Sequence, residues 1–253
     1  MSSEESSARS EEAIGVQLRR WVDGVRALRC QRSADPEAED YLRLKAWQSG
    51  RLMRTYADLL ENPRYHAAAE FFLGELYGTK DFAARDAELE RIVPTLERML
   101  PDRALTTIVQ AMRMDYLSES LDIDMVTQLR RLGGCNRVDD DLYREAYRAC
   151  GRHADREEQI ALIGRIGRSL DRLTRIPLIS TTLRLMKGPA EMAGLARVQN
   201  FLQTGFDAFR RMKGADEFLA TINDRETELM RGWFGEGEPP PPPIKPVRRP
   251  ARP

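Results

Sequence analysis

The sequence is poor in histidine, cysteine and aromatic residues, and it has no excess of charge of either sign. Among 253 residues there are 2 histidines and 3 cysteines, aromatic residues make up 7%, and 40 basic residues balance 40 acidic ones. Non-specific binding of nucleic acid depends on an excess of basic side chains that neutralise phosphates. Zero net charge therefore argues against a nucleic-acid partner.

The sequence also lacks a disulfide pattern, a secretory signal and a long apolar run. Cys30, Cys135 and Cys150 are widely spaced and odd in number, which is typical of reduced thiols. The acidic, polar N-terminus has no basic segment followed by an apolar stretch. No apolar run approaches the ~20 residues of a membrane-spanning helix. These absences predict a cytoplasmic protein without a transmembrane segment.

Strand patterns and fixed-length repeats are absent as well, and helical patterns are present throughout. Apolar residues recur at steps of three and four, as in Leu195, Val198, Leu202, Phe206 and Phe209, which is the spacing of an amphipathic helix. Glycines, prolines and aspartates divide the chain into segments of this kind. The sequence therefore predicts an all-α fold, an irregular bundle of about nine to ten helices with no sheet.

Capping residues mark several helix boundaries. Asp35-Pro36 opens a helix that reaches Glu61, because Asp is a good N-cap and Pro is tolerated at the first helical position. Pro101-Asp102 opens a helix to about Leu117, and a separate, shorter helix covers Met125 to Leu132. Asp139 to Asp141 are expected to cap the helix that follows.

Both ends of the chain differ from the part between them. Residues 1–10 are small, polar and acidic, and residues 235–253 are rich in proline and then basic. We expect both tails to be disordered and residues 11–234 to form a single all-α domain. Within the second tail, residues 243–248 match the PxxPx[+] peptides that SH3-like grooves accept, although a solubilising tail is the favoured interpretation.

A dense set of aromatic and charged residues occupies the stretch from Phe71 to Pro94. It contains Phe71-Phe72-Leu73, Leu76-Tyr77-Gly78, Asp81-Phe82 and Arg85-Asp86. This stretch resembles the signature of a family of uncharacterised bacterial proteins, which reads roughly FFLxxLYGxxDFxxRDxxLxRxxP. The resemblance continues through residues 105–234 and implies an all-helical cytoplasmic protein, with no activity to carry over.

Four residues of this signature form a candidate site at a helix–helix corner: Tyr77, Asp81, Arg85 and Asp86. Gly78 is expected to end one helix and Asp81 to cap the next. The charged pair Arg85 and Asp86 then either binds a ligand or braces the corner. We favour bracing, because orphan backbone groups at helix ends need hydrogen-bond partners.

Metal and haem ligation have one weak candidate each. Asp115, Glu119 and Asp122 follow at i, i+4 and i+7 on one helical face, where three carboxylates suit a hard cation such as Mg²⁺; an acidic face paired with arginines is the favoured alternative. His66 lies beside apolar residues on a helix expected to be buried, so it either ligates haem or, as we favour, is a core or boundary residue. We predict no bound cofactor.

The segment from residue 156 to residue 175 carries two stripes at helical spacing. Arg165, Arg168, Arg172 and Arg175 follow at steps of three and four, and Ile163, Ile166, Leu170 and Leu173 form the opposite, apolar face. Between residues 165 and 187 there are five Arg and one Lys against a single acid, Asp171. The arginines either pair with acidic neighbours, as we favour, or bind an anionic ligand, an acidic protein or an anionic membrane surface.

No catalytic residue is predicted, because no nucleophile has a histidine partner that the sequence can place and no phosphate-binding loop is present. We therefore expect a cytoplasmic interaction module without enzymatic activity, with a protein as its partner. The alternative is a helical pocket for a small anionic or lipid-like ligand or haem, and an enzyme ranks third.

Overall fold

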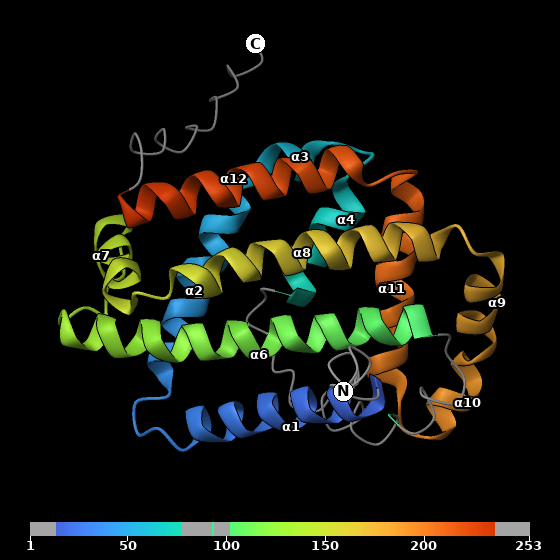
Figure 1. The fold of residues 1–253 in the computed structure, drawn as a ribbon, viewed down its shortest axis with the longest axis horizontal. Helices are drawn as coiled ribbons and strands as arrows, with labels where there is room; N and C mark the ends of the chain where they lie inside the picture. Colours follow the sequence, from blue (N-terminus) through green and yellow to red (C-terminus); the bar gives the residue numbers. More distant parts are fainter. Residues whose placement is uncertain (1–13, 77–92, 94–101, 236–253) are drawn as a thin grey trace, which may run out of the picture.

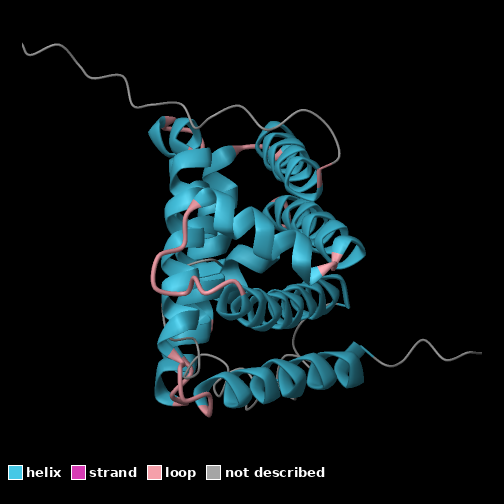
Figure 2. Ribbon diagram, turned by 90° about the vertical axis from the view of Figure 1, so that its left-hand side faces the viewer, coloured by secondary structure: helices cyan, strands magenta, loops and turns pink. Residues whose placement is uncertain are grey.

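The structure is a computed structural model that describes residues 14–76, 93 and 102–235. Every regular element within these ranges is a helix, and Figure 2 shows only helices and loops there. The predicted all-α fold of about nine to ten helices without a sheet is thereby confirmed for the described residues. None of the helices in these ranges combines the length and the apolar character that crossing a bilayer requires.

Four long helices lie side by side and form one layer of the bundle (Figure 1). In their spatial order they are α12 (Asp216–Phe234), α8 (His153–Thr174), α6 (Asp102–Arg131) and α1 (Ile14–Ser33). A second group crosses behind this layer, and it consists of α2 (Glu39–Thr55), α4 (His66–Phe71) and α11 (Ala196–Met212). Figure 2 shows the two groups edge-on.

Shorter elements connect these helices and close the two ends of the bundle. Helix α3 (Ala57–Glu61) and the π-helical turn η1 (Phe72–Leu76) flank α4. Helix α7 (Asp140–Cys150) lies at one end of the molecule. Helices α9 (Pro177–Leu185) and α10 (Lys187–Met192) lie at the opposite end (Figure 1).

Helix α6 is the central element, because it contributes to all three hydrophobic clusters of the described chain. Its N-terminal part packs against α1 through residues such as Val109. Its middle packs against α8 and α12 through Leu121, and its C-terminal part packs against α7 through Met125 and Leu129. With 30 residues it is about 45 Å long at 1.5 Å per residue, so it spans the bundle.

The prediction of two separate helices over residues 101–117 and 125–132 is wrong. Helix α6 continues through the polar stretch between them. Leu121 is fully buried there, and Glu119 and Asp122 are buried as well. Charged residues on the inner face interrupt the apolar periodicity, so the sequence pattern suggests a break where the helix is continuous.

The single helix predicted over residues 35–61 is divided at Tyr56. Helix α2 ends at Thr55, and Tyr56 leaves the helical conformation with φ −114° and ψ 22°. Its ring is buried and its hydroxyl donates a hydrogen bond of 2.7 Å to Glu226 Oε1 on α12. This tertiary contact fixes the turn between α2 and α3.

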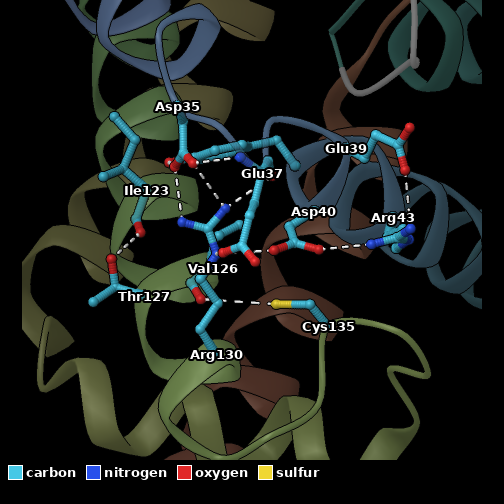
Figure 3. Close-up of polar contacts among 11 residues, drawn as sticks. Asp35, Glu37, Glu39, Asp40, Arg43, Ile123, Val126, Thr127, Arg130 and Cys135 are labelled. Atoms are coloured by element: carbon cyan, nitrogen blue, oxygen red, sulfur yellow. Dashed lines mark hydrogen bonds and ion pairs between the residues drawn. The ribbon is translucent and has the colours of Figure 1, made fainter.

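Arg130, near the end of α6, holds the connection between α1 and α2 (Figure 3). Its guanidinium contacts Asp35 at 2.8 Å and Asp40 at 2.8 Å, and donates a hydrogen bond to the Glu37 carbonyl at 2.8 Å. The hydrogen bonds from Arg130 hold the pKa of Asp35 below its ordinary value. Three backbone or carboxylate acceptors from one short segment thus share one cation.

Candidate functional site

Helix α8 has the two faces that its sequence predicts. Ile163, Ile166 and Leu173 are buried, whereas Arg168 and Arg172 are exposed. Pro177 begins the next helix at its first turn, where its missing N–H leaves no extra unpaired group. The arginine face of α8 therefore ends beside the start of α9.

The four predicted arginines divide into two groups by their partners. Arg165 Nη2 lies 2.7 Å from Glu158 Oε1, and Arg175 Nη2 lies 2.5 Å from Asp171 Oδ2. Arg172 donates a hydrogen bond of 3.2 Å to the Ser169 hydroxyl. Within the part of the chain that the structure describes, Arg168 and Arg172 form no ion pair with an acid. The structure thus leaves two of the four guanidinium groups available to an external anion.

Helix α9 carries an exposed apolar stripe. Leu183 is buried on its inner face, and its carbonyl accepts a hydrogen bond of 2.6 Å from Gln199 Nε2 of α11. On the outer face, Leu178 and Leu185 are 70% and 73% exposed, and Met192 on α10 is 89% exposed. Leu178 and Leu185 are seven residues apart and so share one face of α9, and exposed apolar residues on one face are typical of an interaction site.

Basic residues accompany these leucines in the sequence, and acidic ones are missing between Arg172 and Ala190. Arg184 and Lys187 are exposed on α9 and α10. We call this region the α9 surface, defined by Arg168, Arg172, Leu178, Arg184, Leu185, Lys187 and Met192. Chemically, it can attract anions through guanidinium and ammonium groups and bury apolar side chains at the same place.

Sequence reasoning missed the apolar part of the α9 surface. Residues 178–187 are recognisable as a short apolar helix, but the sequence does not say which of its sides packs inward. A partial signal exists, since Leu178, Thr181 and Leu185 share one side and Leu183 lies on another. The packing of the Leu183 side of α9 against α11 leaves the side with Leu178 and Leu185 facing outward.

The proposed metal ligands on α6 all lie beside basic residues of α1 and α2. Arg29 Nη2 is 2.9 Å from Asp115 Oδ1, and Arg32 Nη1 is 2.7 Å from Glu119 Oε2. Lys45 Nζ, on α2, is 2.7 Å from Asp122 Oδ2. Among the described residues there is no cluster of three or more acidic, histidine or cysteine side chains that could hold a metal ion.

Two of the three carboxylates are buried, and their basic partners Arg32 and Lys45 are partly exposed. Glu119 and Asp122 are 3% and 5% exposed. Burial alone would lower the pKa of the Lys45 ammonium, but the neighbouring Asp122 and Glu119 raise it above its ordinary value. The charges of α6 therefore fix α1 and α2 against it.

His66 is not buried, contrary to expectation. It is exposed at the start of α4, with Nδ1 2.6 Å from the Leu60 carbonyl oxygen and Nε2 3.3 Å from Glu70 Oε1. The neighbouring Tyr65 and Ala68 are the residues that face the core. Axial ligation of haem uses a ring nitrogen that faces an apolar pocket, and both nitrogens of His66 lie beside protein oxygens instead.

The signature corner lies outside the described residues. This applies to Tyr77, Asp81, Arg85 and Asp86, so their assignment as a bracing corner or a ligand site stays a prediction. The residues that precede them, Phe71, Phe72 and Leu73, are buried. The predicted tails lie outside as well, apart from Gly235.

Comparison with known proteins gives a family without an assigned function. A family model described as "Domain of unknown function (DUF8198)" matches residues 27–240. No curated protein and no solved structure matches the chain significantly. The match agrees with the expected membership of an uncharacterised family.

Proposed function

The chain belongs to the DUF8198 family, and we propose that it is an interaction module without enzymatic activity that docks on an anionic lipid surface through the α9 surface. The observation that carries this proposal is the exposure of Leu178 and Leu185 within the stretch from Arg172 to Ala190, which contains basic residues and no acid. Interfacial helices combine an apolar stripe with basic residues in this way.

The strength of such docking follows from its parts. A Lys or Arg close to an anionic bilayer contributes about 1 kcal/mol, and burial of a leucine contributes about 2 kcal/mol. The gross contribution is thus about 8 kcal/mol from two leucines and four cations, Arg168, Arg172, Arg184 and Lys187. The loss of translational and rotational freedom on association offsets several kcal/mol of it. The proposal therefore implies weak, reversible, salt-sensitive binding.

A lipid surface fits the composition of the α9 surface better than a protein partner does. Hot spots of protein interfaces are enriched in Trp, Tyr and Arg, and Leu is under-represented in them. The sequence from Arg165 to Arg197 contains no aromatic residue. Leucine with Lys and Arg is the combination found on helices that lie in the membrane interface.

Four further statements remain proposals beside this one. They are the single-domain organisation of residues 11–234, the disorder of both tails, the cytoplasmic location, and the bacterial origin of the family with its signature at residues 71–94. The proposed docking agrees with a cytoplasmic location, because the cytoplasmic leaflet of a membrane is anionic.

The test is co-sedimentation of the full chain with vesicles of phosphatidylcholine, with and without phosphatidylserine. We expect binding only to the anionic vesicles, and weaker binding as salt screens the charges. The double variant Leu178→Ser/Leu185→Ser should bind at least about tenfold more weakly, because two buried leucines are lost. The double variant Arg168→Gln/Arg172→Gln should bind about thirtyfold more weakly, since it removes two cations that contribute about 1 kcal/mol each.

Two matched controls accompany these variants. Leu42→Ser removes a leucine that is 61% exposed on α2, and Arg165→Gln removes an arginine already paired with Glu158; both should bind as the parent does. Absence of binding to anionic vesicles would contradict the proposal. So would binding to poly-glutamate but not to vesicles, which would assign the surface to an acidic protein.

A further inference from the structure

A small polar cavity lies inside the helix bundle and shares no residue with the α9 surface. It lies between α2, α6, α7, α8 and α12 and has a volume of about 50 Å³, which is room for roughly three or four water molecules or one small oxyanion. Charged side chains in its wall are Lys45, Arg51, Arg156, Asp122 and Glu226. Three basic groups against two acidic ones leave one positive charge in excess.

Two of the three basic groups are neutralised inside the protein. Lys45 Nζ lies 2.7 Å from Asp122 Oδ2, and Arg51 Nη1 lies 2.5 Å from Glu226 Oε1. Both carboxylates receive a further hydrogen bond, one from Gln48 and one from Tyr56. Each of the two acids thus has one basic partner, whereas Arg156 has no acid at ion-pair distance among the described residues.

Arg156 is 7% exposed, and its direct contacts among the described residues are neutral, although the charge of Asp122 contributes to its raised pKa. Its Nη1 donates a hydrogen bond of 3.1 Å to Gln159 Oε1, and its guanidinium carbon lies 4.5 Å from the centre of the Tyr147 ring. Its Nη2 is buried without a hydrogen-bond partner, as is Nε of Arg51 in the same wall. A buried donor without a hydrogen-bond partner is costly, and a guanidinium group without an ion pair attracts an oxyanion, so we expect an anion in the cavity to use these donors.

We propose that this cavity binds a small oxyanion, a carboxylate or phosphate group, through Arg156 and Arg51. Guanidinium groups bind such oxyanions through charge-assisted, often bidentate hydrogen bonds. The aromatic wall formed by Tyr143, Tyr147 and Trp233 limits the ligand to a compact group. The single excess positive charge matches a ligand with one negative charge. Anion binding in this cavity does not depend on the proposed lipid docking.

The test follows the thermal unfolding of the full chain with rising inorganic phosphate and, separately, acetate, at constant ionic strength. A ligand that binds only the folded protein raises Tm in a saturable manner, and we expect this rise with at least one of the two anions. Arg156→Met should abolish the rise while its own Tm without ligand stays equal or increases, because a buried cation without an ion pair is replaced by an apolar side chain. Arg131→Gln, which changes an exposed arginine at the end of α6 outside both proposed sites, should respond as the parent does.

Arg156→Lys separates charge from geometry. It keeps the cation but loses the planar fork, so we expect affinity for the same anion to fall about tenfold. If Arg156→Met fails to fold, Arg156→Lys is the test. A smaller rise of Tm with the anion than in the parent supports binding in the cavity, and an equal rise contradicts it. Absence of a saturable rise in the parent with both anions would overturn the proposal, as would an equal rise in Arg156→Met.

The outcome can be separated from that of lipid docking. Binding of anionic vesicles should be the same for Arg156→Met, Arg156→Lys and the parent, since Arg156 is buried. Loss of the phosphate or acetate response with intact vesicle binding would identify the cavity alone. Loss of vesicle binding in Leu178→Ser/Leu185→Ser should leave the response to these anions unchanged.

Discussion

At the scale of single residues, charge lies inside the protein as well as on its surface. Glu119 is 3% exposed and contacts Arg29 and Arg32 of α1 at 3.2 and 2.7 Å. A buried ion pair adds little stability compared with apolar residues of the same shape, but removal of one partner leaves the other charge without compensation. Such residues are sensitive to substitution even though they form no active site.

We predict that Glu119→Ala lowers the free energy of unfolding by about 3–5 kcal/mol, the usual cost of breaking a buried pair. The control is Asp141→Ala, which removes an acid with a 91% exposed side chain from a pair within α7 and should change stability by less than about 0.5 kcal/mol. Urea unfolding of both variants measures the difference. Equal effects would show that the α1–α6 charges are solvated.

Asp40 provides a prediction about acid stability. Burial alone would raise its pKa, but hydrogen bonds from Arg130 and Arg43 outweigh burial and leave the pKa below its ordinary value. A carboxyl group whose pKa is lowered by folding stabilises the protein above the pKa of the unfolded chain, about 4. This contribution is lost as the pH falls through the folded-state pKa.

Asp40→Asn should therefore be less stable than the parent at pH 7, by about 1–3 kcal/mol for a lost charge-assisted hydrogen bond. The difference between the two proteins should narrow as the pH falls from about 4 toward 2. Unfolding by urea at a series of pH values measures it. A difference that stays constant over this range would mean that the contact between Arg130 and Asp40 stabilises the protein equally whether or not Asp40 is ionised.

At the scale of elements, the sequence predicts helices well where one face is purely apolar. The stripes of α8 and the Asp139 cap of α7, whose side chain accepts a hydrogen bond of 3.0 Å from Leu142 N, follow from local spacing alone. Helix α6 does not, because buried charges such as Glu119 resemble a surface stretch until their partners, 87 to 90 residues away, are known. The outward face of α9 and the cavity around Arg156 also depend on contacts between distant segments.

The packing of α8 on α12 depends on a missing side chain. Gly167 is buried, and a Cβ at this position would overlap the side chain of Leu219 on α12. We predict that Gly167→Ala destabilises the protein by about 1–3 kcal/mol through overpacking. Gly50→Ala on α2 is the matched control, because its Cβ would meet only the Arg54 guanidinium at 3.5 Å.

The control should have the opposite sign. Alanine within a helix is favoured over glycine by about 0.5–1 kcal/mol when no contact opposes it, so Gly50→Ala should raise the free energy of unfolding. Thermal and urea unfolding of the two variants measure both changes. If Gly167→Ala is as stable as Gly50→Ala, the two helices can separate without loss, and α8 is not the fixed support that the proposed docking needs.

At the scale of the whole molecule, α9 and α10 lie at one end of the bundle and α7 at the other (Figure 1). The long helices between them are held together by buried charges and three hydrophobic clusters. Lipid docking would therefore use one end of a fixed body, with α9 lying in the interface and α7 remaining in water.

The most direct measurement uses an environment-sensitive fluorophore at each end. In a background with Cys30→Ser, Cys135→Ala and Cys150→Ala, the label is attached to Thr181→Cys on α9 or to Ala149→Cys on α7, both exposed positions. With vesicles that contain phosphatidylserine, the label at residue 181 should shift to shorter wavelength, and the label at residue 149 should not. The same result is expected after removal of residues 1–10 and 236–253. Equal shifts at both positions, or a shift only at residue 149, would contradict docking through the α9 surface.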